Sequence, residues 1–242
     1  MAKKTNGRRK APKKSFFRRL FKYFIRLSLA WLLITSLLVL SLRWFDPPTT
    51  AFMLQRQWQD EATIQQQWVD LENISPHLVL SVIASEDQKF LLHWGFDVQA
   101  IQQVLAEHSS GKKLRGASTI SQQLAKNLFL WSGRSLLRKG LEAYFTAAIE
   151  IYLPKRRILE LYLNVAELGD TIYGAEAAAR HIYNIPARQL NRQQSALLAA
   201  RLPAPKSYQI NPPSEYMQQR AAWIRGQIKQ LGEYRLLQEL GL

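Results

Sequence analysis

The stretch Ser81–Asp97, SVIASEDQKFLLHWGFD, predicts the fold of the chain around it. Ser75-Pro76, just before it, is typical of a helix start, with an N-cap residue followed by proline at the first helical position. Gly95 is a plausible end of the same helix. Val79, Ile83 and Phe90 recur with helical spacing and lie on one face. The sequence therefore predicts a single helix over this stretch, with an apolar face turned to a core.

Glu86 falls on that apolar face, seven residues after Val79. Burial penalises the charged form of a carboxyl group, so a carboxylate in such a place is suited to moving protons near neutral pH. The alternative is a buried ion pair with an arginine, since ion-pair networks also perturb carboxylates. From this helix alone both interpretations stay open.

Positive charge is concentrated at the amino-terminal end of the chain. Of 33 basic residues, 11 lie in residues 1–26, which contain no acid, while the remaining 22 face 18 acidic residues. A basic tail can bind nucleic acid, but the segment that follows favours a different interpretation. Residues 27–42, LSLAWLLITSLLVLSL, carry no charge over 16 positions and are flanked by interfacial aromatic residues.

We expect residues 27–45 to form a single transmembrane anchor. A cleaved signal peptide is disfavoured because no small-residue cleavage site follows, and a core helix would not carry such a basic flank. The expected organisation is a basic cytoplasmic tail at 1–26, a juxtamembrane segment at 46–74 and a catalytic domain at 75–242. In a bacterium this places the chain in the inner (cytoplasmic) membrane with its domain in the periplasm.

The domain is predicted to be mainly α, with about eight helices. The sequence shows no convincing alternating strand pattern and no glycine-rich nucleotide loop, and Glu167–Asp170 is expected to be a turn. There is no cysteine, which excludes a disulfide framework and a cysteine nucleophile. The four histidines show no metal-ligand spacing, so we expect no protein metal site.

The segment Arg115–Leu130, RGASTISQQLAKNLFL, combines a helix start with a polar face. Thr119 and Gln122 have the spacing of a capping box. A helix amino terminus with several amide groups and a lysine suits phosphates or sugar hydroxyls, whereas a merely solvated polar face is the alternative. We favour binding, and the candidate substrate-binding residues here are Arg115, Ser118, Thr119, Gln122, Gln123, Lys126 and Asn127.

A second helix, Arg138–Tyr152, begins RKGLE, and Arg138 and Glu142 are spaced as an i, i+4 pair. Taken alone, this spacing is more typical of an ordinary surface ion pair than of a site. One carboxylate with several cations indicates a type of reaction. A glycosidase must protonate a poor leaving group, but a diphosphate leaves well when cations hold its charge, and the attacking hydroxyl needs only a base. The pattern therefore fits transfer from a glycosyl diphosphate better than hydrolysis, and a membrane anchor fits a lipid-linked donor.

Four blocks carry a family resemblance: EDQKFLLHWGFD from Glu86, GASTISQQLAKN from Gly116, RKGLE from Arg138 and KRRILELYLNVAELG from Lys155. In this order they resemble the motifs of the monofunctional biosynthetic peptidoglycan transglycosylases, which are similar to the glycosyltransferase domain of class A penicillin-binding proteins. The resemblance covers roughly residues 50–230. One departure is Gln194-Ser195, where the family usually has Glu-Ala.

The resemblance implies a lysozyme-like fold that polymerises lipid II into β-1,4-linked glycan by inverting transfer, with release of undecaprenyl diphosphate and without transpeptidase activity. It implies that Glu86 is the base and Glu142 a second, supporting glutamate. Lys126, Arg138 and Lys139 match positions that hold the diphosphate, and Ser118, Gln122, Gln123 and Asn127 match substrate contacts. A divalent cation, Mg²⁺ or Mn²⁺, is compatible with the family at the substrate diphosphate.

Two other functions compete with this one. A lytic hydrolase of the same fold would use the same lone glutamate, although the QQ–K–N and RKxxE blocks argue against it. A non-catalytic membrane scaffold, or a DNA tether, would leave Glu86 and Lys126 dispensable. The expected partners are lipid II, the growing glycan strand, membrane lipid and proteins of division or cell-wall synthesis, with no nucleic acid.

Overall fold

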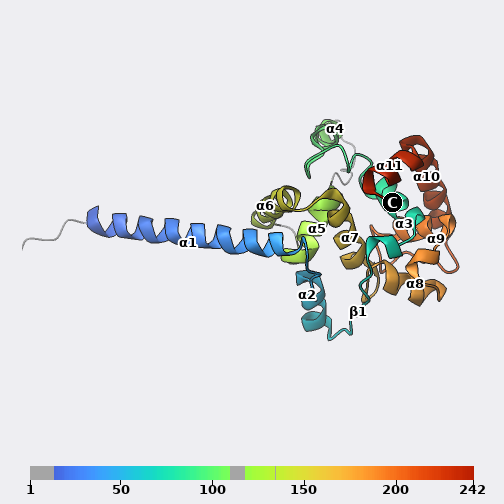
Figure 1. Ribbon diagram of the computed structural model, residues 1–242, viewed down its shortest axis with the longest axis horizontal. Helices are drawn as coiled ribbons and strands as arrows, with labels where there is room; N and C mark the ends of the chain where they lie inside the picture. Colours follow the sequence, from blue (N-terminus) through green and yellow to red (C-terminus); the bar gives the residue numbers. More distant parts are fainter. Residues whose placement is uncertain (1–13, 110–117, 134) are drawn as a thin grey trace, which may run out of the picture.

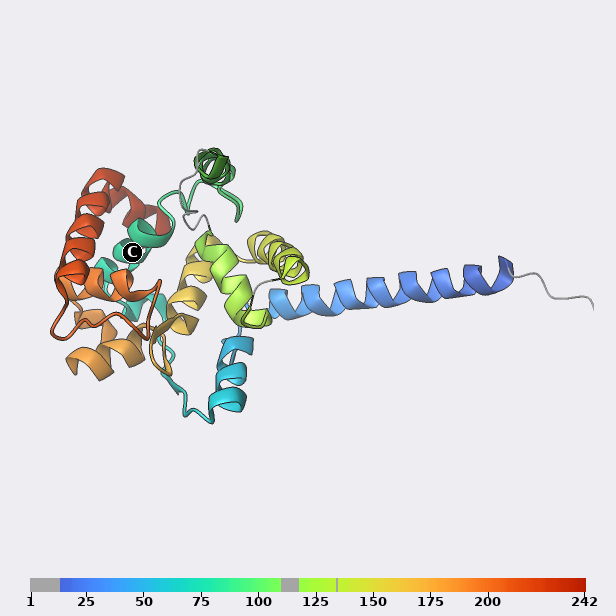
Figure 2. The ribbon, with the colours of Figure 1, turned by 180° about the vertical axis from the view of Figure 1, so that it is seen from behind.

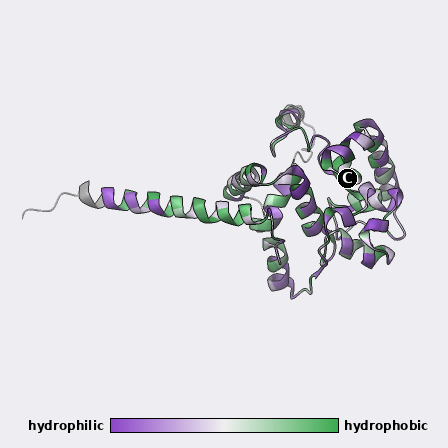
Figure 3. Cartoon of the chain, viewed as in Figure 1, coloured by the Kyte–Doolittle hydropathy of each residue, from purple (hydrophilic) through white to green (hydrophobic). Residues whose placement is uncertain are grey.

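The computed structural model shows a helical domain with one long helix projecting from it (Figures 1 and 2). It describes residues 14–109, 118–133 and 135–242. The projecting helix, α1 (Lys14–Ser41), is apolar over its second half (Figure 3). Its residues Phe17–Ser41 are long and apolar enough to cross a membrane, with a mean hydropathy of 2.0. This helix fits the predicted anchor, although it ends at Ser41, before the expected end at residue 45.

The remaining elements make a mainly α domain, as predicted. The helices are α2 (Ala51–Asp60), α3 (Pro76–Glu86), α4 (Val98–Ser109), α5 (Ile120–Phe129), α6 (Leu136–Tyr152), α7 (Lys155–Val165), α8 (Ala175–Tyr183), α9 (Arg192–Arg201), α10 (Glu215–Leu231) and α11 (Glu233–Leu240). Two short 3-10 helices, η1 (Leu71–Asn73) and η2 (Ala187–Gln189), complete the described helical elements. The chain ends in two helices, α10 and α11, which are separated at Gly232 because this residue adopts a left-handed conformation with φ 82°.

Two groups of helices share one core. In the first, α3 packs against α9 and α10, and in the second, α5 packs against α6 and α7. α3 is buried almost all round, with Leu78, Val79 and Ile83 fully inaccessible. The predicted helix starts at Ser75 and Thr119 are confirmed, and Asn191 and Ser214 begin α9 and α10 in the same way. Each of the four side chains accepts a hydrogen bond from a backbone N–H of the first turn.

The turn expected at Glu167–Asp170 is wrong in part, because Glu167–Gly169 belongs to a small sheet of short strands. β1 (Gln65–Gln66), β2 (Glu167–Gly169) and β3 (Ile172–Tyr173) form a sheet in the order β1-β3-β2. β1 runs parallel to β3, pairing Gln65 with Ile172, and β2 runs antiparallel to β3. Strands of two or three residues are too short to show alternation in the sequence, and their pairing depends on a long-range contact.

The helix predicted from Ser75 to Gly95 ends much earlier, at Glu86. Its C-cap, Asp87, leaves the helical region with φ −160° and ψ 77°. Phe90 is still fully buried, but from a turn after the helix. Glu86 is therefore the last residue of α3 instead of a residue in its middle, and this frees its carboxylate to face other elements.

The segment between the anchor and residue 75 is packed with the domain. Met53 on α2 and Leu71 and Ile74 around η1 are at most 1% exposed and belong to the common core. α2 also packs against α5. The predicted domain limits stay a prediction, but this part of the chain contributes both to the core and, through α2, to the walls of the site described next.

Candidate active site

Glu86 lies at the carboxyl end of α3, where a chain of hydrogen bonds fixes it. Gln123 on α5 donates from Nε2 to Glu86 Oε2 at 2.9 Å, and Tyr162 on α7 donates from its hydroxyl to Gln123 Oε1 at 2.9 Å. Ser85 Oγ donates to the other carboxylate oxygen at 3.1 Å. Glu86 is half-buried and forms no ion pair with any residue that the structure describes. The buried ion pair with an arginine that the sequence left open is therefore absent among the described residues. Uncharged hydrogen-bond donors orient the Glu86 carboxylate instead.

Tyr162 is the last residue of this hydrogen-bond chain and was not among the predicted site residues. It is 1% exposed, and burial together with the charges of Glu86 and Asp87 raises the pKa of its phenol well above the usual range. The hydroxyl therefore stays a donor throughout the physiological range. The local sequence around Tyr162 gives no sign of the hydrogen bond that its hydroxyl makes across to α5.

Asp87 explains why α3 and α5 meet at this point. Its Oδ2 accepts a hydrogen bond from the backbone N–H of Ile120 at 3.0 Å, and its Oδ1 lies 2.9 Å from His93 Nε2. Asp87 is 7% exposed, so this carboxylate caps the amino terminus of α5 inside the protein. The interaction accounts for the early end of α3, because the chain must leave the helix for Asp87 to reach Ile120.

The predicted capping box at the start of α5 is present. Its two side chains, which were candidate binding residues, hydrogen-bond backbone groups of the helix start. Thr119 Oγ1 accepts from Gln122 N at 3.2 Å, Gln122 Oε1 accepts from Thr119 N at 3.0 Å, and Thr119 Oγ1 donates to Gly95 O at 2.7 Å. Both side chains are buried. In this conformation they shape α5, while Ser118 is exposed beside them. Arg115 lies outside the described residues.

Lys126, further along α5, is a half-buried cation without a neutralising partner. Its Nζ lies 5.4 Å from the centre of the Phe52 ring, and it forms no hydrogen bond or ion pair with any described residue. Its pKa is lowered, first by burial and also by the charges of Arg138 and Lys139, against the opposing effect of Glu142 and Glu86. The side chain is therefore placed to meet an incoming negative charge.

The predicted pair on α6 is confirmed and is part of a triad. Arg138 Nη1 donates to one oxygen of Glu142 at 2.9 Å, and Lys139 Nζ donates to the other oxygen at 2.5 Å. Glu142 is 3% exposed. A carboxylate engaged by two cations is poorly suited to act as a base. Its evident effect is to hold Arg138 and Lys139 on the face near Lys126.

Two hollows lie next to the Glu86–Gln123 hydrogen bond. One, of about 230 Å³, is lined by Glu86 together with Lys89, Ser118 and other residues. The second, of about 200 Å³, is lined by Gln123, Lys126 and Asn127. Glu86 belongs to the first hollow and its partner Gln123 to the second. Two hollows linked by this hydrogen bond can hold two sugar units, with the carboxylate in the wall of the first.

The wall of the second hollow carries a buried polar cluster, which the sequence did not predict. Glu167 Oε1 lies 4.0 Å from Arg56 Nε and from Lys206 Nζ, but Glu167 Oε1, Arg56 Nε and Tyr173 OH make no hydrogen bond with any described residue. Burial raises the pKa of Glu167 above its usual value, although Lys206 and Arg56 oppose the change. Buried polar groups are normally paired, so these atoms are suited to bind the hydroxyls or amides of a ligand. Glu167 lies within the quoted KRRILELYLNVAELG block, where a turn was expected.

The site lies beside the anchor. Tyr144 on α6, which also carries Arg138 and Glu142, shares a 2.6 Å hydrogen bond with Thr35 on α1 and stacks on Trp31 with ring centres 4.8 Å apart. Thr35 precedes the end of α1 by six residues, which is about 9 Å at 1.5 Å per residue. α6 therefore packs against the last turns of the membrane-span candidate.

No group of three or more His, Cys, Asp or Glu side chains able to hold a metal ion occurs among the described residues. Of the two site glutamates, Glu142 is already engaged by two cations. The described side chains do not fit a protein metal cage. The divalent cation expected at a substrate diphosphate stays a prediction.

Comparison with known proteins adds a consistent set of matches. A family model described as Transglycosylase matches residues 53–229. The chain is 54% identical over 233 residues to a biosynthetic peptidoglycan transglycosylase of Ectopseudomonas mendocina, covering 94% of each chain. It is 53% identical to one of Pseudomonas fluorescens, over 89% of this chain and 90% of that protein, and 50% identical to one of Shewanella oneidensis, over 90% and 95%.

Proposed function

Because this chain belongs to the transglycosylase family, we propose that its peptidoglycan glycosyltransferase activity polymerises lipid II into β-1,4-linked glycan strands. The transfer inverts the anomeric carbon and releases undecaprenyl diphosphate. The observation that carries the proposal is the contrast between the two glutamates. Glu86 is held by neutral donors only, whereas Glu142 is engaged by two cations.

In the proposed reaction, Glu86 accepts the proton of the acceptor sugar's 4-hydroxyl. The hydroxyl oxygen forms a bond to the donor's anomeric carbon as the bond from that carbon to the diphosphate oxygen breaks. Displacement from the opposite side inverts the centre, and the electron pair leaves with the diphosphate. Gln123 and Tyr162 position the base, since they fix the direction of its Oε2.

The leaving diphosphate develops charge where Lys126, Arg138 and Lys139 lie. Lys126 is uncompensated among the described residues and partly desolvated, so its attraction for an anion is weakly screened. Glu142 keeps the other two cations in place. In this assignment the hollow lined by Lys126 and Asn127 receives the donor, and the one lined by Glu86 and Ser118 receives the acceptor. Glu167 Oε1 and Tyr173 OH, which make no hydrogen bond with a described residue, are suited to donor hydroxyls.

The position of α6 supports a lipid-linked donor. Its contact with Thr35 and Trp31 keeps the cations close to the end of the membrane-span candidate, where the diphosphate of a membrane lipid is found. Leu136 and Leu137 at the start of the same helix are 93% and 70% exposed, as suits a surface that faces lipid. We place the basic tail in the cytoplasm and the domain in the periplasm, at the inner membrane.

The test is to incubate the full chain with labelled lipid II and identify the products. We expect long glycan that still carries lipid at one end, and no shortening of finished glycan. Soluble fragments released from purified cell wall would show a lytic enzyme instead. Monofunctionality is tested with a fluorescent β-lactam: the sequence holds no KTG motif to accompany an SxxK serine, so no covalent labelling is expected.

A further inference from the structure

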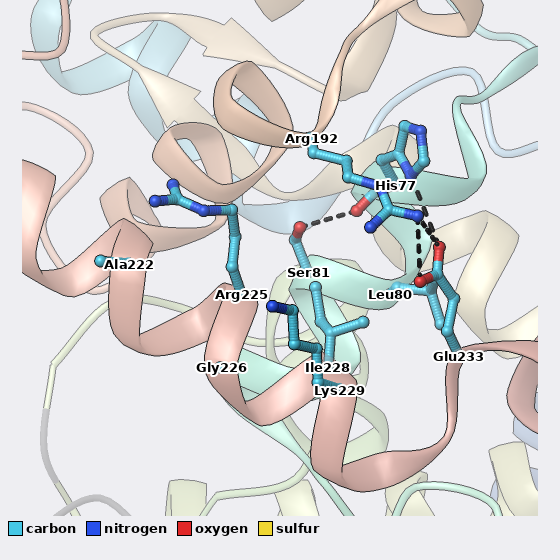
Figure 4. A pocket seen from close by; sticks show the side chains of 10 residues that line it. All are labelled: His77, Leu80, Ser81, Arg192, Ala222, Arg225, Gly226, Ile228, Lys229 and Glu233. Atoms are coloured by element: carbon cyan, nitrogen blue, oxygen red, sulfur yellow. Dashed lines mark hydrogen bonds and ion pairs between the residues drawn. The ribbon is translucent and has the colours of Figure 1, made fainter.

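A larger pocket lies beside the first half of α3 and shares no lining residue with the two hollows just described. Its volume is about 410 Å³, and its lining comes from α3, α9, α10 and α11 (Figure 4). In both ribbon views these helices form the end of the domain opposite α1 (Figures 1 and 2). The pocket therefore lies on the side of the domain away from the membrane-span candidate. The proposed glycosyl transfer makes no use of it.

The charged residues of the pocket are unbalanced. Arg192, Arg225 and Lys229 line it with a single carboxylate, Glu233. Glu233 is already engaged, because Arg192 donates to it at 3.0 Å and His77 Nδ1 lies 3.9 Å away (Figure 4).

The two cations on the opposite wall, which belongs to α10, are not paired with a carboxylate of any described residue. Arg225 hydrogen-bonds only the neutral side chain of Gln193, and Lys229 has no hydrogen bond or ion pair with any described residue. Arg225 and Lys229 are four residues apart and so lie on one face of α10. Two uncompensated cations one turn apart can hold a carboxylate group, in the way that Arg192 holds Glu233 on the other wall.

Apolar side chains complete the pocket. Leu80, which is 1% exposed, and Ile228 lie between the charged walls, and the lining, all of it described, holds no aromatic ring besides the His77 imidazole. Sugars and nucleobases are commonly bound by stacking on aromatic rings, which this lining lacks. An apolar floor between cationic walls instead fits a ligand that combines an aliphatic side chain with a carboxylate.

Gly226, between the two cations on α10, leaves this wall of the pocket open. Glycine inside a helix costs stability relative to alanine, and it is kept where another backbone or a ligand must approach closely. A Cβ on Gly226 would meet no atom within 4 Å, so packing within the protein does not require glycine here. Gly226 lines the pocket, and its missing side chain leaves room for an occupant.

We propose that this pocket binds an acidic peptide segment of a partner protein on the membrane-distal side of the domain. The segment places an aliphatic side chain over Leu80 and Ile228 and a carboxylate on Arg225 and Lys229. A periplasmic partner can reach this surface while the transferase site works at the membrane. The interaction would tether the enzyme to other proteins without occupying the hollows around Glu86.

The test uses the full chain in neutral detergent and three fluorescein-labelled peptides, made of Leu-Glu, Leu-Gln and Leu-Lys repeats. Fluorescence anisotropy should show the Leu-Glu peptide binding at least about tenfold more tightly than the other two. The double variant Arg225→Gln/Lys229→Gln should lose at least about tenfold in that affinity. The matched double variant Arg220→Gln/Arg235→Gln removes the same charge from α10 and α11 outside the pocket, and should bind as the parent does.

Glycine variants separate binding from folding. Gly226→Ala should raise the melting temperature by about 2–4 °C, because alanine favours the helix, yet weaken peptide binding. Gly140→Ala, in α6, also meets open space and should raise the melting temperature without changing peptide binding. The proposal is overturned if the Leu-Glu peptide binds no better than Leu-Gln, if the Arg225/Lys229 variant binds it unchanged, or if free glutamate competes equally well. None of these outcomes bears on polymerisation of lipid II, so failure here leaves the proposed function intact.

Discussion

Replacing Lys126 by methionine should separate catalysis from stability more cleanly than any other change at the site. The methionine keeps an unbranched chain over Phe52 and removes only the ammonium group. The ammonium is partly buried, lies near Arg138 and Lys139, and has no hydrogen-bonding partner among the described residues. These surroundings indicate a cation kept for a charge that arrives with the substrate.

The expected loss of activity follows from that arrangement. Removing one preorganised group that meets a developing anion typically costs about 10²–10³-fold in rate, or about 2.7–4 kcal/mol. The effect on folding should be small. Loss of the cation–π contact, about 0.5–2 kcal/mol, is offset by a sulfur–aromatic contact of about 0.3–1.5 kcal/mol and by relief of the buried charge.

The pH dependence of stability gives a further check on this reasoning. Folding lowers the pKa of Lys126, so the folded state disfavours the charged lysine. That cost is fully present at neutral pH and fades as pH rises through the folded pKa toward the ordinary value of 10.5. Lys126→Met should therefore be at least as stable as the parent at pH 7, and this advantage should shrink at alkaline pH.

The assay combines lipid II turnover with thermal unfolding at neutral and alkaline pH. Arg235→Gln on α11 serves as the control, since it also removes one cation but from an exposed side chain paired with Glu239. It should leave turnover unchanged. Near-parental turnover by a well-folded Lys126→Met protein would refute the reasoning, as would a marked loss of stability at pH 7.

Three further predictions follow from the site and the anchor. Glu86→Gln should fold, bind lipid II and lose about 10²–10⁴-fold in rate, as expected for a missing general base; substantial polymer from this variant would place the base elsewhere. Tyr162→Phe should lower kcat about tenfold with little change in KM, because it releases the amide of Gln123 that orients Glu86, whereas the exposed Tyr216→Phe should change neither. A reporter active only outside the cytoplasm, fused after Leu242, should be active, and activity of a cytoplasmic reporter alone would reverse the proposed topology.

The sequence by itself determined the features that depend on local interactions. Helix starts at Ser75, Thr119, Asn191 and Ser214 are each encoded by a capping side chain and the few residues after it. The Arg138–Glu142 pair follows from helical spacing alone. The apolar run of α1 and the motif blocks are likewise readable without coordinates, and so is the transglycosylase family to which they point.

Only the tertiary structure decided which of the candidate residues stabilise a helix and which orient the catalytic carboxylate. Asp87 ends α3 because its carboxylate bonds Ile120 on another helix, and no pattern within α3 encodes that partner. Gln122 and Gln123 are adjacent and chemically identical, yet one closes a capping box and the other holds Glu86, since successive helix positions point about 100° apart toward different neighbours. Tyr162 and Glu167 join the site through contacts between elements distant in the chain. Residues close in the sequence determine where helices begin. The role of a polar side chain depends instead on which group from a distant part of the chain lies within hydrogen-bonding distance after folding.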